Sequence, residues 1–100
     1  MKQGTTPTHI FLIPFDTSTI TNLAILYAQG DSVILRKELA DCTLEGQEIK
    51  VTLTQEETFL FDNKKDAKIQ LHVLVAGENA LVSDIYTVSV DKCLDDEVLT

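Results

Sequence analysis

Residues 49–58 read IKVTLTQEET, and the backbone pattern changes in the middle of this segment. Its first five positions alternate apolar and polar side chains, which is typical of a β-strand with one buried and one solvated face. Thr54 and Glu57 then have the spacing of a capping box, in which each side chain accepts from the backbone amide of the other residue. The segment therefore predicts a strand over 49–53 followed by a short helical turn near residues 55–60.

The same period-two alternation recurs on both sides of this segment. It predicts further strands over residues 8–15, 20–28, 32–38, 69–75 and 80–90. Residues 40–44 fit either a short strand or an extended loop, and residues 77–79 fit a hairpin loop. Short strands separated by regularly spaced turns are typical of a β-sandwich or a small barrel. The sequence therefore predicts an all-β fold of about six to eight antiparallel strands.

Two segments are candidates for the edges of the sheets. Pro14 cannot donate to a ladder, so the strand over 8–15 should lie at an edge, or end, near that residue. The less regular residues 40–44 are the second candidate. An open edge strand can pair with a strand of another chain, although both edges can equally well be capped within the domain.

The length of 100 residues predicts a single domain over 1–100, with residues 1–6 and 92–100 open to fraying. Hydrophobic residues make up 44% of the chain, which is enough to build a core without metal or disulfide crosslinks. Two cysteines are too few for a disulfide framework. We therefore expect Cys42 and Cys93 to be free thiols.

The formal net charge of −8 argues against two classes of partner. Nucleic acids and anionic membranes both select basic surfaces, and this chain has 8 Lys and Arg residues against 16 Asp and Glu residues. Residues 1–8 lack the apolar stretch of a secretory signal, and no segment has the apolar length of a membrane span. We therefore expect no signal peptide, and a cytoplasmic location unless a particle carries the protein out.

The residues that could support catalysis or metal binding are few. His9 and His72 are the only imidazoles, and a zinc site would require one or two further ligands that their spacing does not supply. Cys42 and His72 could form a thiol–imidazole pair only if the fold brought them together. A buried cysteine and two histidines on sheet faces are the simpler interpretation.

The acidic residues also have structural explanations. Glu57 belongs to the capping box, and Glu56 would interact favourably with the positive end of a helix. The acidic segment 95–97 lacks the spaced oxygens and the turn glycine of a calcium loop. Phosphate-binding glycine loops and nucleophile-elbow patterns are absent from the sequence. We therefore expect no enzymatic activity, no cofactor and no metal.

Three segments carry a resemblance to a known group of proteins. They are the opening Gly4-Thr5-Thr6-Pro7-Thr8 with the strand that follows it to Asp16, the segment Val51 to Phe61, and the closing hairpin from Ile69 to Val90. Together they resemble small proteins encoded among the structural genes of prophages in low-GC Gram-positive bacteria. They are also similar to the N-terminal immunoglobulin-like domain of the phage baseplate upper protein.

The resemblance implies an immunoglobulin-like β-sandwich and a structural or assembly role in a bacteriophage or prophage particle, in the tail, baseplate or neck. Its implied partners are other phage structural proteins, or further copies of itself in a homo-oligomer, and its implied location is the virion. The family's motifs are structural, so they assign no functional residues. A different immunoglobulin-like protein-binding module, such as a regulator or a piece of a surface adhesin, is the alternative.

Overall fold

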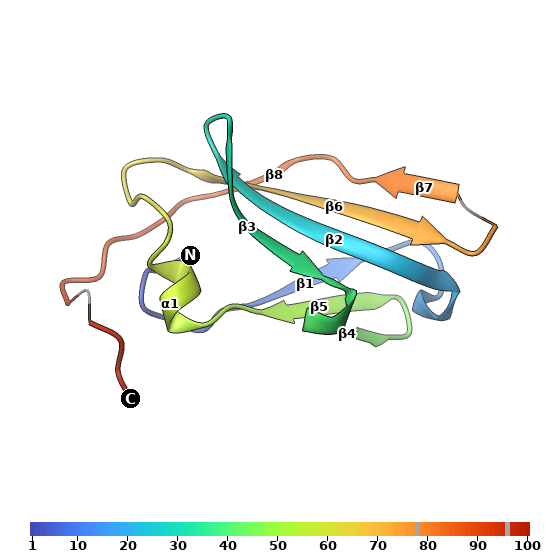
Figure 1. Ribbon diagram of the computed structural model, residues 1–100, viewed down its shortest axis with the longest axis horizontal. Coiled ribbons are helices and arrows are strands. Elements are labelled where there is room, and N and C mark those ends of the chain that lie inside the picture. Colours follow the sequence, from blue (N-terminus) through green and yellow to red (C-terminus); the bar gives the residue numbers. More distant parts are fainter. Residues whose placement is uncertain (78, 96) are drawn as a thin grey trace.

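Two antiparallel β-sheets face each other in the computed structural model (Figure 1). The structure describes residues 1–77, 79–95 and 97–100. Glu78 of the predicted hairpin loop and Asp96 of the acidic segment lie outside the described residues. The prediction of an all-β sandwich is confirmed.

The smaller sheet contains three strands in the order β1-β5-β4. Their bounds are Thr8–Leu12 for β1, Glu48–Thr52 for β5 and Cys42–Glu45 for β4. The strand predicted over 49–53 is therefore the central strand of this sheet. Its apolar positions point into the sandwich, where Ile49 and Val51 are buried.

The larger sheet is built around β2 (Ile20–Gln29) and β6 (Ala67–Val75), which are the two longest strands. Strand β3 (Ser32–Glu38) lies on the outer side of β2. Strands β7 (Asn79–Val82) and β8 (Tyr86–Val88) both pair with β6, at opposite ends of it. The short helical segments are η1 (Thr17–Thr19), η2 (Leu39–Asp41) and α1 (Gln55–Thr58).

The strand order has the topology of an immunoglobulin-type sandwich. The smaller sheet, in the order β1-β5-β4, corresponds to strands B, E and D of that fold. The larger sheet corresponds to strands C′, C, F and G, with β3 as C′, β2 as C, β6 as F and the β7–β8 pair as G. The chain crosses between the sheets after β1, β3 and β5. No described segment takes the place of strand A beside β1.

Two predicted strands differ in extent from the observed ones. The strand predicted over 8–15 ends at Leu12, and the chain bends at Pro14 and Phe15. The strand predicted over 80–90 is divided into β7 and β8 by residues 83–85. Ser83 explains the interruption, because its hydroxyl accepts from the Leu71 amide at 2.9 Å while its own amide donates to the Leu71 carbonyl. Of the two alternatives for residues 40–44, the short strand is confirmed as β4 from Cys42 onward, and the preceding residues belong to the helical segment η2.

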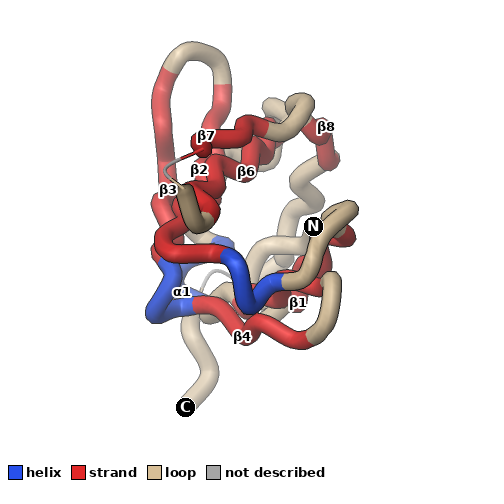
Figure 2. Tube along the Cα trace, turned by 90° about the vertical axis from the view of Figure 1, so that its right-hand side faces the viewer, coloured by secondary structure: helices blue, strands red, loops and turns tan. Residues whose placement is uncertain are grey.

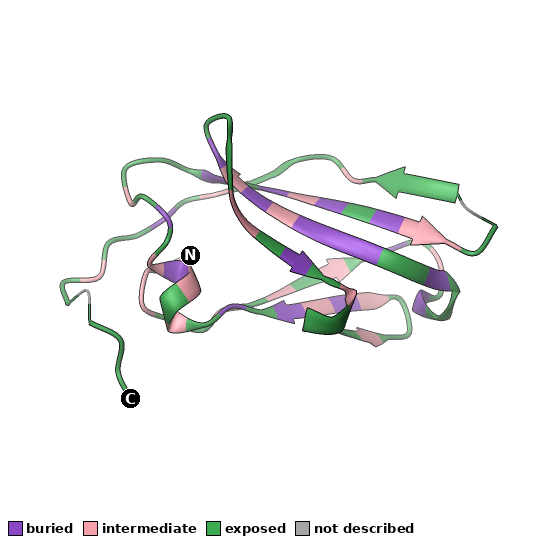
Figure 3. Cartoon of the chain, viewed as in Figure 1, coloured by how far each residue is buried: buried purple, intermediate pink, exposed green. Residues whose placement is uncertain are grey.

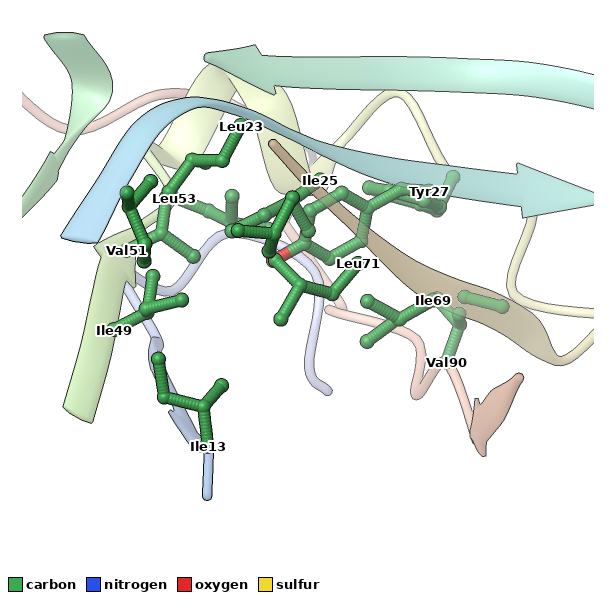
Figure 4. Close-up of a cluster of buried hydrophobic side chains, with 14 residues drawn as sticks. Ile13, Leu23, Ile25, Tyr27, Ile49, Val51, Leu53, Ile69, Leu71 and Val90 are labelled. Atoms are coloured by element: carbon green, nitrogen blue, oxygen red, sulfur yellow. The ribbon is translucent and has the colours of Figure 1, made fainter. Parts of the chain in front are cut away.

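The core lies between the two sheets and is drawn from both of them (Figure 4). Tyr27 and Ile25 are fully buried, and Phe61 reaches the same core from the segment after α1. Tyr27 and Phe61 contact edge to face, with 6.0 Å between ring centroids. The other buried apolar residues of the cluster are Ile13, Ile20, Leu23, Ile49, Val51, Leu53, Ala67, Ile69, Leu71, Val73 and Val90.

The predicted capping box is present at the start of α1. The Thr54 hydroxyl accepts from the Glu57 amide at 3.1 Å, and the Glu57 carboxylate accepts from the Thr54 amide at 2.8 Å. The buried Thr58 at the end of the helix accepts from the Gly4 amide at 2.9 Å. Gly4 has φ +79°, and a Cβ there would lie 2.9 Å from the Phe59 ring. This close approach attaches the N-terminal segment to the helix.

A buried glutamine holds the turn between α1 and β6. Gln29 is 6% exposed, and its amide nitrogen donates to the carbonyls of Asp62 and Lys65 at 2.8 and 3.0 Å. Its side-chain oxygen accepts from the Asp62 amide at 2.8 Å. The end of β2 thereby supplies the hydrogen bonds that this turn cannot make within itself.

We predict that Gln29→Leu lowers the free energy of unfolding by about 1–3 kcal/mol, because it leaves partly buried backbone groups of the turn without partners. Urea denaturation measures the change. Gln47→Leu is the matched control, because Gln47 is exposed and its side chain makes no hydrogen bond to the described residues. Equal denaturation midpoints for the two variants would contradict this role of Gln29.

Candidate protein-binding surface

Strand β1 is an edge strand with hydrogen bonds on one side only. It pairs with β5, and no second strand among the described residues lies beside it. At its two ends the Leu53 amide donates to the Pro7 carbonyl, and the Ile13 amide donates to the Gln47 carbonyl, both at 3.0 Å. The odd-numbered residues of β1 therefore bond to β5, because hydrogen-bonded pairs alternate along an antiparallel ladder.

The even-numbered residues of β1 point their backbone groups the other way. Thr8, Ile10 and Leu12 direct their N–H and C=O groups to the open side of the strand. Within the described residues these groups make no hydrogen bond to another segment. The open edge thus offers three donors and three acceptors in a straight row about 14 Å long. Such a row is a template for pairing with another strand.

A groove lies between this open edge and the larger sheet. It consists of two hollows of about 450 and 270 Å³ that share Phe11, Leu12 and Tyr86 in their linings. The first extends along β1 to Ile69, and the second extends to Leu81 and the residues after β7. In Figure 2, β8 and β1 lie on the same side of the sandwich, away from β3. We call this feature the β1–β8 groove.

Apolar side chains are exposed on both rims of the β1–β8 groove. On the β1 rim, Ile10 and Leu12 are 55% and 76% exposed. On the opposite rim, Leu81, Val82 and Tyr86 are 46–58% exposed, and every described residue of β7 is exposed along its length (Figure 3). Exposed apolar groups gathered around a concave surface are typical of a site for protein contacts.

Of the described residues that line the two hollows, Asp84 is the only Asp, Glu, Lys or Arg. Its carboxylate forms no ion pair or hydrogen bond with the described residues. The chain as a whole is acidic, with a net charge of −8. The charge in the groove therefore favours a partner with a basic side chain.

The second candidate edge from the sequence is also an edge strand, but a less open one. In the part of the chain that the structure describes, strand β4 pairs only with β5, in four residue pairs. The Cys42 amide at its start already donates to the Leu39 carbonyl of η2. Of the two edges of the smaller sheet, β1 is therefore the longer and the less satisfied.

The two histidines lie on opposite sides of the larger sheet and form no common site. His9 points inward from β1, and its Nδ1 lies 2.7 Å from the Tyr27 hydroxyl. His72 is exposed on the outer face of β6, opposite Ala24 and Val82. No group of three potential metal ligands occurs among the described residues.

Burial shifts the pKa of both members of the His9–Tyr27 pair. It lowers the pKa of the His9 imidazole below 6.5 and raises the pKa of the Tyr27 hydroxyl. Both groups are therefore neutral near pH 7, and the hydrogen bond between them joins the two sheets.

The two cysteines are free thiols, as the sequence predicts. Cys42 lies on β4, where its Sγ donates to the Glu38 carbonyl at 3.4 Å. Burial raises the pKa of the Cys42 thiol, which disfavours the thiolate that a nucleophile requires. Cys42 is on the smaller sheet and His72 is on the outer face of the larger sheet, so the fold does not assemble them into a pair.

Glu57 joins α1 to the larger sheet. Its carboxylate accepts from the Lys37 ammonium of β3 at 2.6–2.8 Å. Partial burial alone would raise the pKa of Glu57, but the hydrogen bonds from Lys37 and from the Thr54 amide outweigh it, so the pKa lies below its ordinary value. The neighbouring Glu56 is exposed. The adjacent glutamates therefore serve the local structure of α1.

The sequence did not predict the second rim of the groove. A continuous strand over 80–90 gave no reason to place Leu81 and Tyr86 beside β1. Ser83 and Asp84 are two adjacent polar residues in an otherwise apolar run, and they are the sign in the sequence that this strand is interrupted.

Comparisons of the chain with protein-family models, with curated proteins and with solved structures each give no match. The assignment of the fold therefore rests on the strand topology. Among the described residues, no helix has the length and the apolar character needed to cross a membrane.

We predict that the His9 imidazole makes folding stability depend on pH. Because its folded-state pKa lies below 6.5, the unfolded chain binds a proton that the folded chain does not between these two pKa values. The stabilisation is fully present above about pH 6.5 and is lost as the pH falls through the folded-state pKa.

Urea denaturation between pH 8 and pH 5 measures this dependence. His9→Asn should remove part of the loss of stability on acidification, because the amide can still bond to Tyr27 but does not titrate. His72→Asn, which changes the exposed imidazole, is the control. If His9→Asn and the wild type lose the same free energy of unfolding over this range, the prediction is wrong.

Proposed function

We propose that this chain is a non-enzymatic protein-binding module that acts as a structural or assembly component of a bacteriophage or prophage particle. The observation that supports protein binding is the open edge of β1 together with the apolar β1–β8 groove beside it. The sequence resemblance to prophage structural proteins supports a role in such a particle, in its tail, baseplate or neck.

The chemistry of the candidate residues is consistent with a role without catalysis. His9 is engaged with Tyr27, Glu57 is engaged with Lys37, and Cys42 has a raised thiol pKa. Each of these groups is explained by packing or by a local hydrogen bond. Several of the large exposed apolar side chains lie elsewhere, on the two rims of the groove: Ile10, Leu12, Leu81, Val82 and Tyr86.

The proposal predicts that the chain is a stoichiometric part of purified particles. Particles would be induced from the bacterium that encodes the chain, purified on a density gradient and washed in high salt. Quantitative mass spectrometry should find the chain at a fixed ratio to the other structural proteins across gradient fractions. An abundant host cytoplasmic protein, followed in the same fractions, controls for carry-over.

Absence of the chain from intact particles, or a ratio that falls with washing as the host protein does, would reject the particle role. A non-phage binding module, either a regulator or a piece of an adhesin, would then be the better interpretation.

A further inference from the structure

We propose that the β1–β8 groove binds an extended segment of a partner protein, which pairs with the open edge of β1 at the place that strand A has in an immunoglobulin-type sandwich. This inference rests on the proposed protein-binding function and specifies its partner as a β-strand with alternating apolar side chains and a basic residue. The binding mode is strand addition, in which backbone bonds supply affinity and side-chain pockets supply selectivity.

The backbone of β1 sets the first requirement on the partner. Thr8, Ile10 and Leu12 present unpaired N–H and C=O groups at every second residue, about 7 Å apart. An extended chain of at least five residues matches this spacing. A helix does not, because its N–H and C=O groups are bonded within the helix.

The position of the two hollows sets the second requirement. They lie behind the open edge, between the sheets, and are lined mainly by apolar side chains such as Phe11, Ile69 and Leu81. A strand bonded to β1 points every second side chain toward these hollows. The partner should therefore have apolar residues at alternate positions, while its other side chains extend the outer face beside Ile10 and Leu12.

The charge in the groove sets the third requirement. Asp84 lines the smaller hollow without a partner among the described residues, and no Lys or Arg among these residues lines either hollow. A Lys or Arg near the Leu12 end of the added strand would pair with this carboxylate.

A second copy of this chain fits these requirements poorly as the occupant. Pairing of two β1 edges would bring together only five residues from each copy, which is far less area than the roughly 1,000 Å² expected for a stable dimer. It would also bring two chains of net charge −8 together and leave both Asp84 carboxylates unpaired. We therefore expect the isolated chain to be a monomer.

Short synthetic peptides test the inference directly on the full chain. The probes are acetyl-KTVTLTVT-amide and acetyl-TVTLTVTK-amide, which place the lysine at either end of an alternating strand. The controls replace Lys by Glu, or the central Leu by Pro. At least one lysine peptide should bind in titration calorimetry, and both control changes should weaken its binding by about ten-fold or more.

Amide hydrogen exchange followed by NMR locates the bound peptide. The amides of Thr8, Ile10 and Leu12 should exchange at least about ten-fold more slowly in the complex, because each gains a hydrogen bond. The Phe11 amide should change little, because it already bonds to β5. Protection of a different edge, or binding that leaves these three amides unchanged, would overturn the inference.

Two pairs of variants separate the contributions of the edge and of the charge. Ile10→Pro removes an edge donor without removing a β1–β5 bond and should abolish peptide binding, whereas Ile10→Val should retain it. Asp84→Asn should remove the preference for the Lys peptide over the Glu peptide, whereas the exposed Asp31→Asn should not. Thermal denaturation confirms that each variant is folded.

Failure of these tests is distinguishable from failure of the proposed function. If the chain is found in particles but no peptide binds β1, the particle role stands and the strand-addition inference is wrong. Concentration-dependent light scattering of the free chain completes the test. A discrete oligomer that Ile10→Pro dissociates would assign the edge to a second copy and overturn the partner strand.

Discussion

The hydrogen bond between Tyr27 and His9 fixes how the two sheets face each other. Tyr27 lies near the C-terminal end of β2, where it is fully buried and also contacts Phe61 from the segment after α1. Its hydroxyl must find a partner inside the sandwich, because an unpaired buried hydroxyl is costly. His9 of β1 supplies that partner at 2.7 Å. One hydrogen bond thus links both sheets, and it also sets the orientation of β1. Because the His9 side chain points inward, the neighbouring Thr8 and Ile10 direct their backbone groups to the open edge.

The sequence predicts the fold well wherever one face of a strand is buried and the other is solvated. Strand β5 and its capping box at Thr54 and Glu57 were both identified from spacing alone, because the polar and apolar positions have a single interpretation. Strand β1 is harder, since Ile10 and Leu12 make both of its faces apolar and its pattern does not show which face is inside. The structure resolves this by pairing His9 with Tyr27, a contact between residues 18 positions apart that no local pattern contains.

Only one rim of the candidate site can be predicted from the sequence, because the other rim depends on contacts between distant residues. Pro14 marks β1 as an edge strand from sequence alone, because proline cannot continue a ladder. The opposite rim depends on the pairing of Ser83 with Leu71, which divides β7 from β8 and brings Tyr86 opposite Phe11 at 6.1 Å between ring centroids. Natural edge strands are commonly protected by inward charges or by a covering segment. Apart from its short length, β1 has neither within the described residues. This lack of protection is what identifies β1 as the candidate binding edge.

The ion pair between Lys37 and Glu57 has a consequence for how the sandwich responds to salt. It joins β3 of the larger sheet to α1, which directly follows the smaller sheet, on the side where the chain also crosses from β3 to β4. Both connections lie away from the β1–β8 groove, where the sheets meet through aromatic and aliphatic contacts such as Phe11 with Tyr86. The β3 side is therefore held by an ion pair as well as by a chain crossing, whereas the groove side, where the chain crosses after β1, has no ion pair between the sheets among the described residues. Salt screens charges but not apolar contacts, so any weakening of the sandwich by added salt would be confined to the β3 side.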